Sequence, residues 1–133
     1  MHGRERHNKG GSMVELALLL PLLVLILAGV VDLGRAFHDY IVITNASREG
    51  ARYASHFPND LTGIRDTAND EAVSTGVAID TNQVSVDVLN APSGDPITVT
   101  VHYGFHTILA RIVGVPTIML TSRTQMVVFG YDD

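Results

Sequence analysis

The sequence predicts an α+β fold in which one long N-terminal helix, first transmembrane and then amphipathic, packs on a small antiparallel sheet of about three strands beside a second short helix. Three observations lead to this prediction. No residue ionises in the leucine-rich run between Glu15 and Asp32. No turn sequence follows this run until Pro58. From Gln83 onward, the apolar residues recur with the two-residue period of strands.

The apolar run has the length of a membrane span. A helix needs about 20 mostly apolar residues to cross the hydrocarbon core of a bilayer, and residues 11–31 meet this requirement. We therefore predict a cytoplasmic leader at residues 1–10, a transmembrane segment at 11–31 and an exported α+β domain at 32–133. Residues 32–57 of that domain continue the long helix.

A cleavable signal peptide is the competing interpretation of this run. Its apolar core would be only about 7–15 residues long and would end at small residues of the A-x-A type. Here the core is longer, Pro21 lies within it, and Ala28-Gly29-Val30 is a poor cleavage match. The pattern therefore favours a retained span.

Charge on the two sides of the run predicts its orientation. The leader is basic, with three cations against one acid (Arg4, Arg6, Lys9 and Glu5). From Asp32 to its end the chain has six arginines, no lysine and 12 acids. Short basic flanks remain in the cytoplasm, so we expect the N-terminus there and the domain outside. The net charge of −5 argues against nucleic-acid binding, which requires a basic face.

Glu15, at the head of the run, has two interpretations. Ser12 and Glu15 fit the S-x-x-E capping box of a helix start. Alternatively, cleavage between Gly10 and Gly11 would create an α-amino group that pairs with Glu15 of a neighbouring subunit. That pair would relieve the cost of an acid at the lipid boundary and fix the register between helices.

Three blocks of sequence occur in order within the first 57 residues: Gly10-x-x-x-Val14-Glu15-x-Ala17-Leu18-x-Leu20-Pro21, Gly29-Val30-Val31-Asp32-Leu33-Gly34-Arg35 and Asn45-Ala46-Ser47-Arg48-Glu49-Gly50-Ala51-Arg52-Tyr53-Ala54. Together they resemble the TadE-like pseudopilins of Tad (Flp) pilus systems, a type IV pilin-like family. The chain departs from related pilins at Leu16, where an aromatic residue often stands.

The resemblance implies a minor pseudopilin that assists assembly of a surface filament from the bacterial inner membrane. It implies cleavage by a prepilin peptidase at Gly10 and Gly11, and contacts with membrane lipid and with other pilin-like subunits through the N-terminal helix. It also marks six residues as packing positions of the family motif: Gly34, Arg35, Arg48, Glu49, Gly50 and Arg52. Pro21 is either a flexible point of the helix or a proline that the membrane helix tolerates.

The long helix should begin at Gly11 or Ser12 and end near His56, because a residue before proline disfavours helix. Beyond residue 31 its apolar residues recur at three- and four-residue steps and define one face that the rest of the chain should cover. These residues are Leu33, Ala36, Phe37, Tyr40, Ile43, Ser47, Gly50, Ala51, Ala54 and Phe57. The charged residues, among them Asp32, Arg35 and Asp39, should supply the solvated face.

A second helix is expected at residues 63–74, capped by Asp60 or Thr62. One face should consist of apolar residues: Ile64, Ala68, Ala72 and Val73. Strands are expected at 84–88, 97–103 and 117–129, with turn residues at 90–96 and an apolar connector at 105–113.

The sequence holds no constellation typical of an enzyme. His102 and His106 would have zinc-like spacing only on a helix, whereas His102 lies in a strand pattern. No cysteine is present, which excludes a disulfide scaffold and a cysteine-ligated metal site. We predict no catalytic residue and no cofactor. Two alternatives to a minor pseudopilin stay open: a main filament subunit and an unprocessed membrane-anchored binding module.

Overall fold

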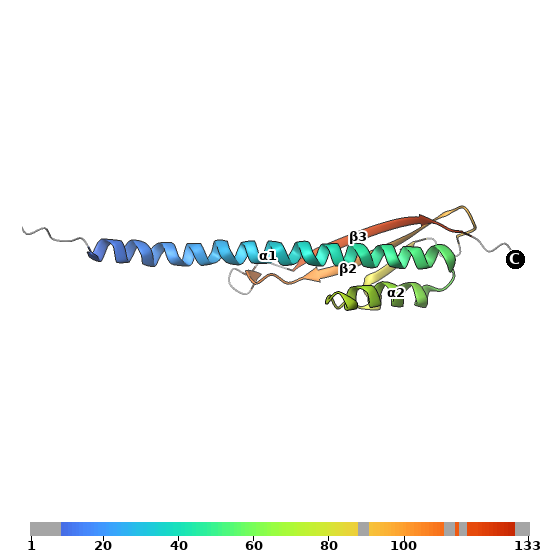
Figure 1. Ribbon diagram of the computed structural model, residues 1–133, viewed down its shortest axis with the longest axis horizontal. Helices are drawn as coiled ribbons and strands as arrows, with labels where there is room; N and C mark the ends of the chain where they lie inside the picture. Colours follow the sequence, from blue (N-terminus) through green and yellow to red (C-terminus); the bar gives the residue numbers. More distant parts are fainter. Residues whose placement is uncertain (1–8, 88–90, 111–113, 115–116, 130–133) are drawn as a thin grey trace, which may run out of the picture.

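The computed structural model describes residues 9–87, 91–110, 114 and 117–129 of the chain. Its elements are α1 (Lys9–His56), α2 (Leu61–Ser74), the 3-10 turn η1 (Thr81–Gln83), β1 (Val84–Asp87), β2 (Pro96–Phe105) and β3 (Ile118–Val127). The predicted α+β fold, with a long N-terminal helix, a second helix and a three-stranded antiparallel sheet, is confirmed. Figure 1 shows α1 as a rod whose second half carries the other elements.

α1 extends over 48 residues, which is about 70 Å at 1.5 Å per residue. It ends at His56 as predicted, and the N–H of Phe57 still bonds to the carbonyl of Tyr53 at 2.9 Å. It begins at Lys9, earlier than predicted, and Pro21 does not interrupt it. Of the two interpretations of Glu15, the capping box does not fit the structure, because Ser12 lies inside the helix whereas a capping residue is non-helical.

The first half of α1 is uncovered by the rest of the chain. Every residue from Gly10 to Leu27 is exposed. Among the described residues, α1 is the one helix that is long and apolar enough to cross a membrane, and none of its apolar window is buried. Its leucines therefore do not belong to the core of this domain.

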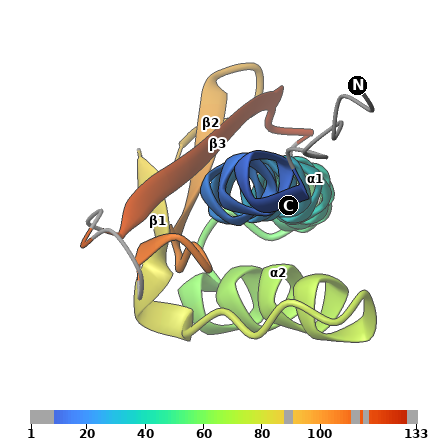
Figure 2. The same cartoon turned by 90° about the vertical axis from the view of Figure 1, so that its left-hand side faces the viewer.

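The second half of α1 lies against one face of the sheet, with α2 beside it, as the view along the helix shows (Figure 2). The covered face of α1 consists mostly of small residues: Ile43, Ala46, Ser47, Gly50, Ala51 and Ala54. Opposite them, Ile97, Val99 and Val101 of β2 are completely buried. Small side chains allow the helix to approach the strand closely, as at Gly50, where an added Cβ would lie 3.2 Å from Val99.

One buried polar contact joins α1 to β3. The hydroxyl of Ser47 lies 2.8 Å from that of Thr124 and 3.2 Å from that of Ser122. It also donates to the carbonyl oxygen of Thr44 at 2.9 Å. Because its hydrogen bonds are made, Ser47 can be buried without the cost of an unpaired hydroxyl.

The sheet has the order β1-β2-β3, with β2 in the centre. Val101 of β2 pairs with Val84 of β1, and Phe105 pairs with Ile118 of β3. Phe105 was predicted to begin the connector, but it is the last residue of β2 and only 1% exposed. The predicted end of the first strand, Val88, lies outside the described residues.

α2 begins just after Asp60, whose carboxylate accepts the N–H of Gly63 at 2.9 Å, as a capping residue does. Ile64, Ala68 and Ala72 are buried as predicted. Val73 is 53% exposed, which contradicts its predicted place on this face. The buried residues recur every four positions, and Val73, one position further, turns away from the contact.

The apolar face predicted for the outer half of α1 is covered only in part. Its second half packs in the core, but Leu33, Phe37, Tyr40 and Phe57 remain 70%, 66%, 46% and 51% exposed. The sheet and α2 cover the face that includes Ile43, and the exposed residues lie on other sides of the helix. Asp32, predicted to be solvated, is instead 5% exposed.

Candidate functional site

The predicted processing and pairing residues lie on the uncovered part of α1. Gly10 and Gly11 are exposed in its first turn, and a Cβ added at either would meet nothing within 4 Å. Glu15 is exposed, and within the part of the chain that the structure describes it makes no hydrogen bond or ion pair. The head of the helix is therefore accessible to another protein.

Asp32 ties the domain to α1 where the apolar run ends. Its carboxylate accepts the backbone N–H of Ile108 at 2.8 Å and that of Leu109 at 3.0 Å. Arg35 lies 3.4 Å from the same carboxylate. The turn 107–110 is closed by Thr107, whose hydroxyl accepts the N–H of Ala110 at 2.8 Å. Sequence reasoning missed this anchor, although an acid directly after an apolar run is itself a signal that a partner is needed.

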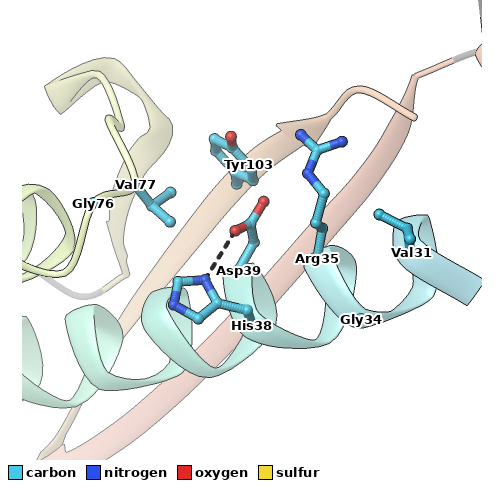
Figure 3. Close-up of a pocket in the computed structure, with 8 residues that line it drawn as sticks. All are labelled: Val31, Gly34, Arg35, His38, Asp39, Gly76, Val77 and Tyr103. Atoms are coloured by element: carbon cyan, nitrogen blue, oxygen red, sulfur yellow. Dashed lines mark hydrogen bonds and ion pairs between the residues drawn. The ribbon is translucent and has the colours of Figure 1, made fainter. Parts of the chain in front are cut away.

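Arg35 lies at the edge of an open groove of about 520 Å³ (Figure 3). Its guanidinium carbon is 5.4 Å from the centre of the Phe105 ring, a cation–π distance. The lining residues come from α1, β2 and the segment after α2: Val31, Gly34, Arg35, His38, Asp39, Gly76, Val77 and Tyr103. Figure 3 shows polar side chains of α1 and the ring of Tyr103 gathered around it.

The groove is lined partly by polar side chains, among them His38 and Asp39. His38 Nδ1 lies 3.3 Å from Asp39, and both groups are on the same side of one helix. Burial and the Asp39 carboxylate raise the pKa of Tyr103, while Arg35 opposes this shift. None of the described residues form a group of three potential metal ligands. His102 and His106 contact Thr121 and Thr117 instead of each other.

The family-motif residues of α1 have different surroundings. A Cβ on Gly50 would lie 3.2 Å from both Ala68 and Val99, so this glycine is a close contact of α1 with α2 and β2. Glu49 accepts two hydrogen bonds from Arg52, at 2.7 and 2.9 Å, and this contact raises the pKa of Arg52. A Cβ on Gly34 would meet nothing within 4 Å, so among the described residues no side chain packs there.

An apolar stripe, defined here as Leu33, Phe37, Tyr40 and Ile41, continues the surface of the uncovered helix past Asp32. Tyr40 and Ile41 are about half exposed, and Leu33 and Phe37 more so. Arg48 and Thr44 extend the same side of α1 in a shallow groove of about 270 Å³. Leu33, Phe37 and Tyr40 of the stripe belong to the predicted apolar face, whereas Ile41 was not predicted on it.

A second polar cluster holds the turn between the two helices. The hydroxyl of Tyr53 donates to the Asp60 carboxylate at 2.8 Å. The hydrogen bonds from Gly63 and Tyr53 lower the pKa of Asp60. The same contact with Asp60, with burial, raises the pKa of Tyr53. This cluster lies far from the open head of α1 and has a structural role.

Comparison with known proteins adds one finding. Residues 10–52 match the model of a family described as "TadE-like protein", and no curated protein and no solved structure matches the chain. The matched stretch lies entirely within α1. It includes the uncovered apolar half, Asp32 and Gly50, so the family likeness is carried by the long helix. The uncovered apolar helix and this match together indicate a membrane-anchored protein.

Proposed function

We propose that this chain, whose residues 10–52 form a TadE-like domain, is a minor pseudopilin-like component in the assembly of a Tad-type pilus or a related secretion apparatus. TadE-like proteins are associated with Tad pili as structural components. The observation that carries the proposal is the matched helix itself. Its first half is apolar and uncovered, while its second half holds a small folded domain.

The open surface of α1 supports partners in the membrane. In lipid, an apolar helix is stable alone, and it can later exchange lipid contacts for contacts with other pilin-like helices. Exposed glycines at residues 10 and 11 suit recognition and cleavage by a prepilin peptidase. Cleavage there would place a new α-amino group four residues before Glu15.

Glu15 would then be the register residue of the assembled helices. An unpaired carboxylate drawn into the edge of the hydrocarbon is costly. The α-amino group of a neighbouring mature subunit offers the opposite charge. A pair of this kind is satisfied at only one axial offset between helices, so it selects one packing arrangement.

Mass spectrometry of the mature N-terminus and a Glu15→Ala variant test the proposal. We expect a mature chain that begins at Gly11, and we expect Glu15→Ala to be cleaved normally but to reduce filament assembly. Asp66→Ala, which removes an exposed acid from α2, is the matched control and should assemble normally. Normal assembly of Glu15→Ala would remove the pairing role.

The groove of Figure 3 favours a second candidate, an unprocessed membrane-anchored module that presents the domain to a ligand. An intact Met1 in the mature protein would support this alternative. A third possibility is a main filament subunit. The amount of this chain in sheared filaments distinguishes a main subunit from a minor one. We expect the chain to be a trace component of sheared filaments, and a dominant amount would identify it as the main subunit.

A further inference from the structure

We propose that the lipid-contacting surface of this chain reaches Tyr40, well past the end of the apolar run, and that the turn 107–110 of the domain lies at the boundary between the hydrocarbon core and the headgroup layer. The partner is a phospholipid surface. The inference rests on the membrane insertion that the proposed function requires.

The length of α1 gives the first argument. The hydrocarbon core is about 30 Å thick, which corresponds to about 20 helical residues. Counted from Leu16, directly after the charged Glu15, this distance ends at Arg35. The headgroup layer adds about 5–7 Å on each side, or about three to five residues, and ends between about residue 38 and Tyr40. Asp32 therefore falls within the span.

Asp32 does not prevent this placement, because its charge faces protein. The side chain is only 6% exposed and accepts two backbone N–H groups while Arg35 lies 3.4 Å away. The first ionisable residue of α1 after Glu15 with an exposed charged group is Arg35, at 50%. An arginine at the hydrocarbon edge can extend its guanidinium toward the headgroups.

The apolar stripe is at the level that this count assigns to lipid. Leu33 and Phe37 are 70% and 66% exposed on a face that the sheet leaves open. Tyr40 follows at the expected level of the headgroups, where tyrosine is enriched in membrane proteins. Exposure of this apolar surface to water would be unfavourable, and contact with lipid removes that cost.

The turn 107–110 is held beside α1 between Gly29 and Asp32, three to six residues before the hydrocarbon count ends at Arg35. The Leu109 side chain lies 3.8 Å from the position of a Cβ on Gly29, a residue of the apolar run. Ile108 is 40% exposed beside it. At the edge of the hydrocarbon, where water is scarce, non-helical backbone needs bonded polar groups. Asp32 and Thr107 accept the N–H groups of Ile108, Leu109 and Ala110.

Tryptophan fluorescence tests this placement without background, because the chain contains no tryptophan. The full chain would be reconstituted in vesicles of phosphatidylethanolamine and phosphatidylglycerol that contain lipids brominated at defined depths. Ile108→Trp and Leu33→Trp are the test variants. Ile26→Trp marks the middle of the span, and Phe129→Trp, 65% exposed beside Ser55 at the far end of the domain, is the matched control outside it.

We expect bromines near the headgroups to remove most of the emission of both test variants. Bromines near the chain ends should quench Ile26→Trp, and Phe129→Trp should keep its emission with every lipid. Unquenched Ile108→Trp beside a quenched Ile26→Trp would overturn the interfacial turn and leave the span intact. Leu33→Trp shielded from lipid would indicate a second helix on the stripe and contradict the inference. Unquenched Ile26→Trp would overturn the span and the inference together.

Discussion

Asp32 shows how one carboxylate can join segments that lie far apart in the sequence, since it bonds the amides of Ile108 and Leu109. Its two oxygens each accept one N–H, as an acid does at the start of a helix. The contact fixes the height of the turn 107–110 along α1. The Asp32 side chain thereby fixes how far this end of the domain extends along α1 toward the apolar run.

Replacing Asp32 by asparagine should loosen this turn. Asparagine has one oxygen in place of two and no charge, so one amide of the turn loses its acceptor. We expect amide hydrogen exchange of Ile108 and Leu109 to rise by at least about tenfold, the scale of one lost charge-assisted bond. Asp39→Asn, on the same helix, is the control and should leave these two amides unchanged. Equal protection in both variants would contradict the anchor.

Asp60 gives a prediction about pH. Hydrogen bonds from Gly63 and Tyr53 lower its pKa in the folded chain. A lowered folded pKa contributes stability that is present above the unfolded value, about 3.9, and is lost as the pH falls through the folded value. The melting temperature of the wild type in detergent should therefore exceed that of Asp60→Asn near neutral pH, and the difference should shrink below about pH 4.

The matched control for this titration is Asp66→Asn, which removes the same charge from the exposed side of α2 without touching the cap. Its melting temperature should follow that of the wild type throughout the acid range. A constant difference between the wild type and Asp60→Asn at every pH would show that the charge of Asp60 adds nothing to the cap.

The long helix presents different surroundings along its length, and two of its glycines report this. A Cβ at Gly50 would meet Ala68 and Val99 at 3.2 Å, whereas one at Gly34 would meet nothing. Gly50→Val should lower the free energy of unfolding by about 1–3 kcal/mol, because the added methyl groups overpack the crossing of α1 with α2 and β2. Gly34→Val should change it by less than about 0.5 kcal/mol, since valine is no worse than glycine in a helix. Thermal and denaturant unfolding in detergent measures the free energy of unfolding of both variants. Equal decreases in the two variants would contradict the difference between the surroundings of Gly50 and Gly34.

Most elements of the fold were predictable because their signals are local. Pro58 ends α1, Asp60 caps α2, and the two-residue period marks β2. The stripe was not predictable, since periodicity says which residues share a face but not how wide a face the sheet covers. Asp32 was missed for a related reason: its partners are backbone amides of a turn that no pattern in the sequence places beside it.

At the scale of the whole molecule, the chain is a rod whose two halves have different surroundings. The first half of α1 exposes leucine side chains, and the second half buries alanine, glycine and serine residues under the sheet. For Gly10, Gly11 and Glu15 the structure shows only that they are exposed on the uncovered helix, so their processing and pairing roles stay predictions. Gly34 and Arg35 lie where the uncovered half of α1 meets the domain, so their surroundings depend on three-dimensional placement.

The charge difference between leader and domain predicts the orientation of the rod. The chain has no cysteine, so a single introduced cysteine reports which side of the membrane it faces. Cysteine at Asn59, in the exposed turn between the helices, should react with a membrane-impermeant maleimide added outside the cell. His2→Cys in the leader of the uncleaved precursor, in cells that lack the prepilin peptidase, should react only after permeabilisation, because basic flanks stay in the cytoplasm.

Reversing the leader charge should reduce this orientation. In a chain that carries Arg4→Glu, Arg6→Glu and Lys9→Glu, the excess of Lys and Arg no longer lies before the span, so outside labelling of the cysteine at residue 59 should fall. The charge-conserving pair Arg4→Lys and Arg6→Lys is the control and should label like the parent. The domain could still fold on the wrong side, because its core lies entirely beyond the span and includes residues of α1, α2 and the sheet. Unchanged outside labelling in the reversed chain would mean that the domain, and not the leader, determines the topology.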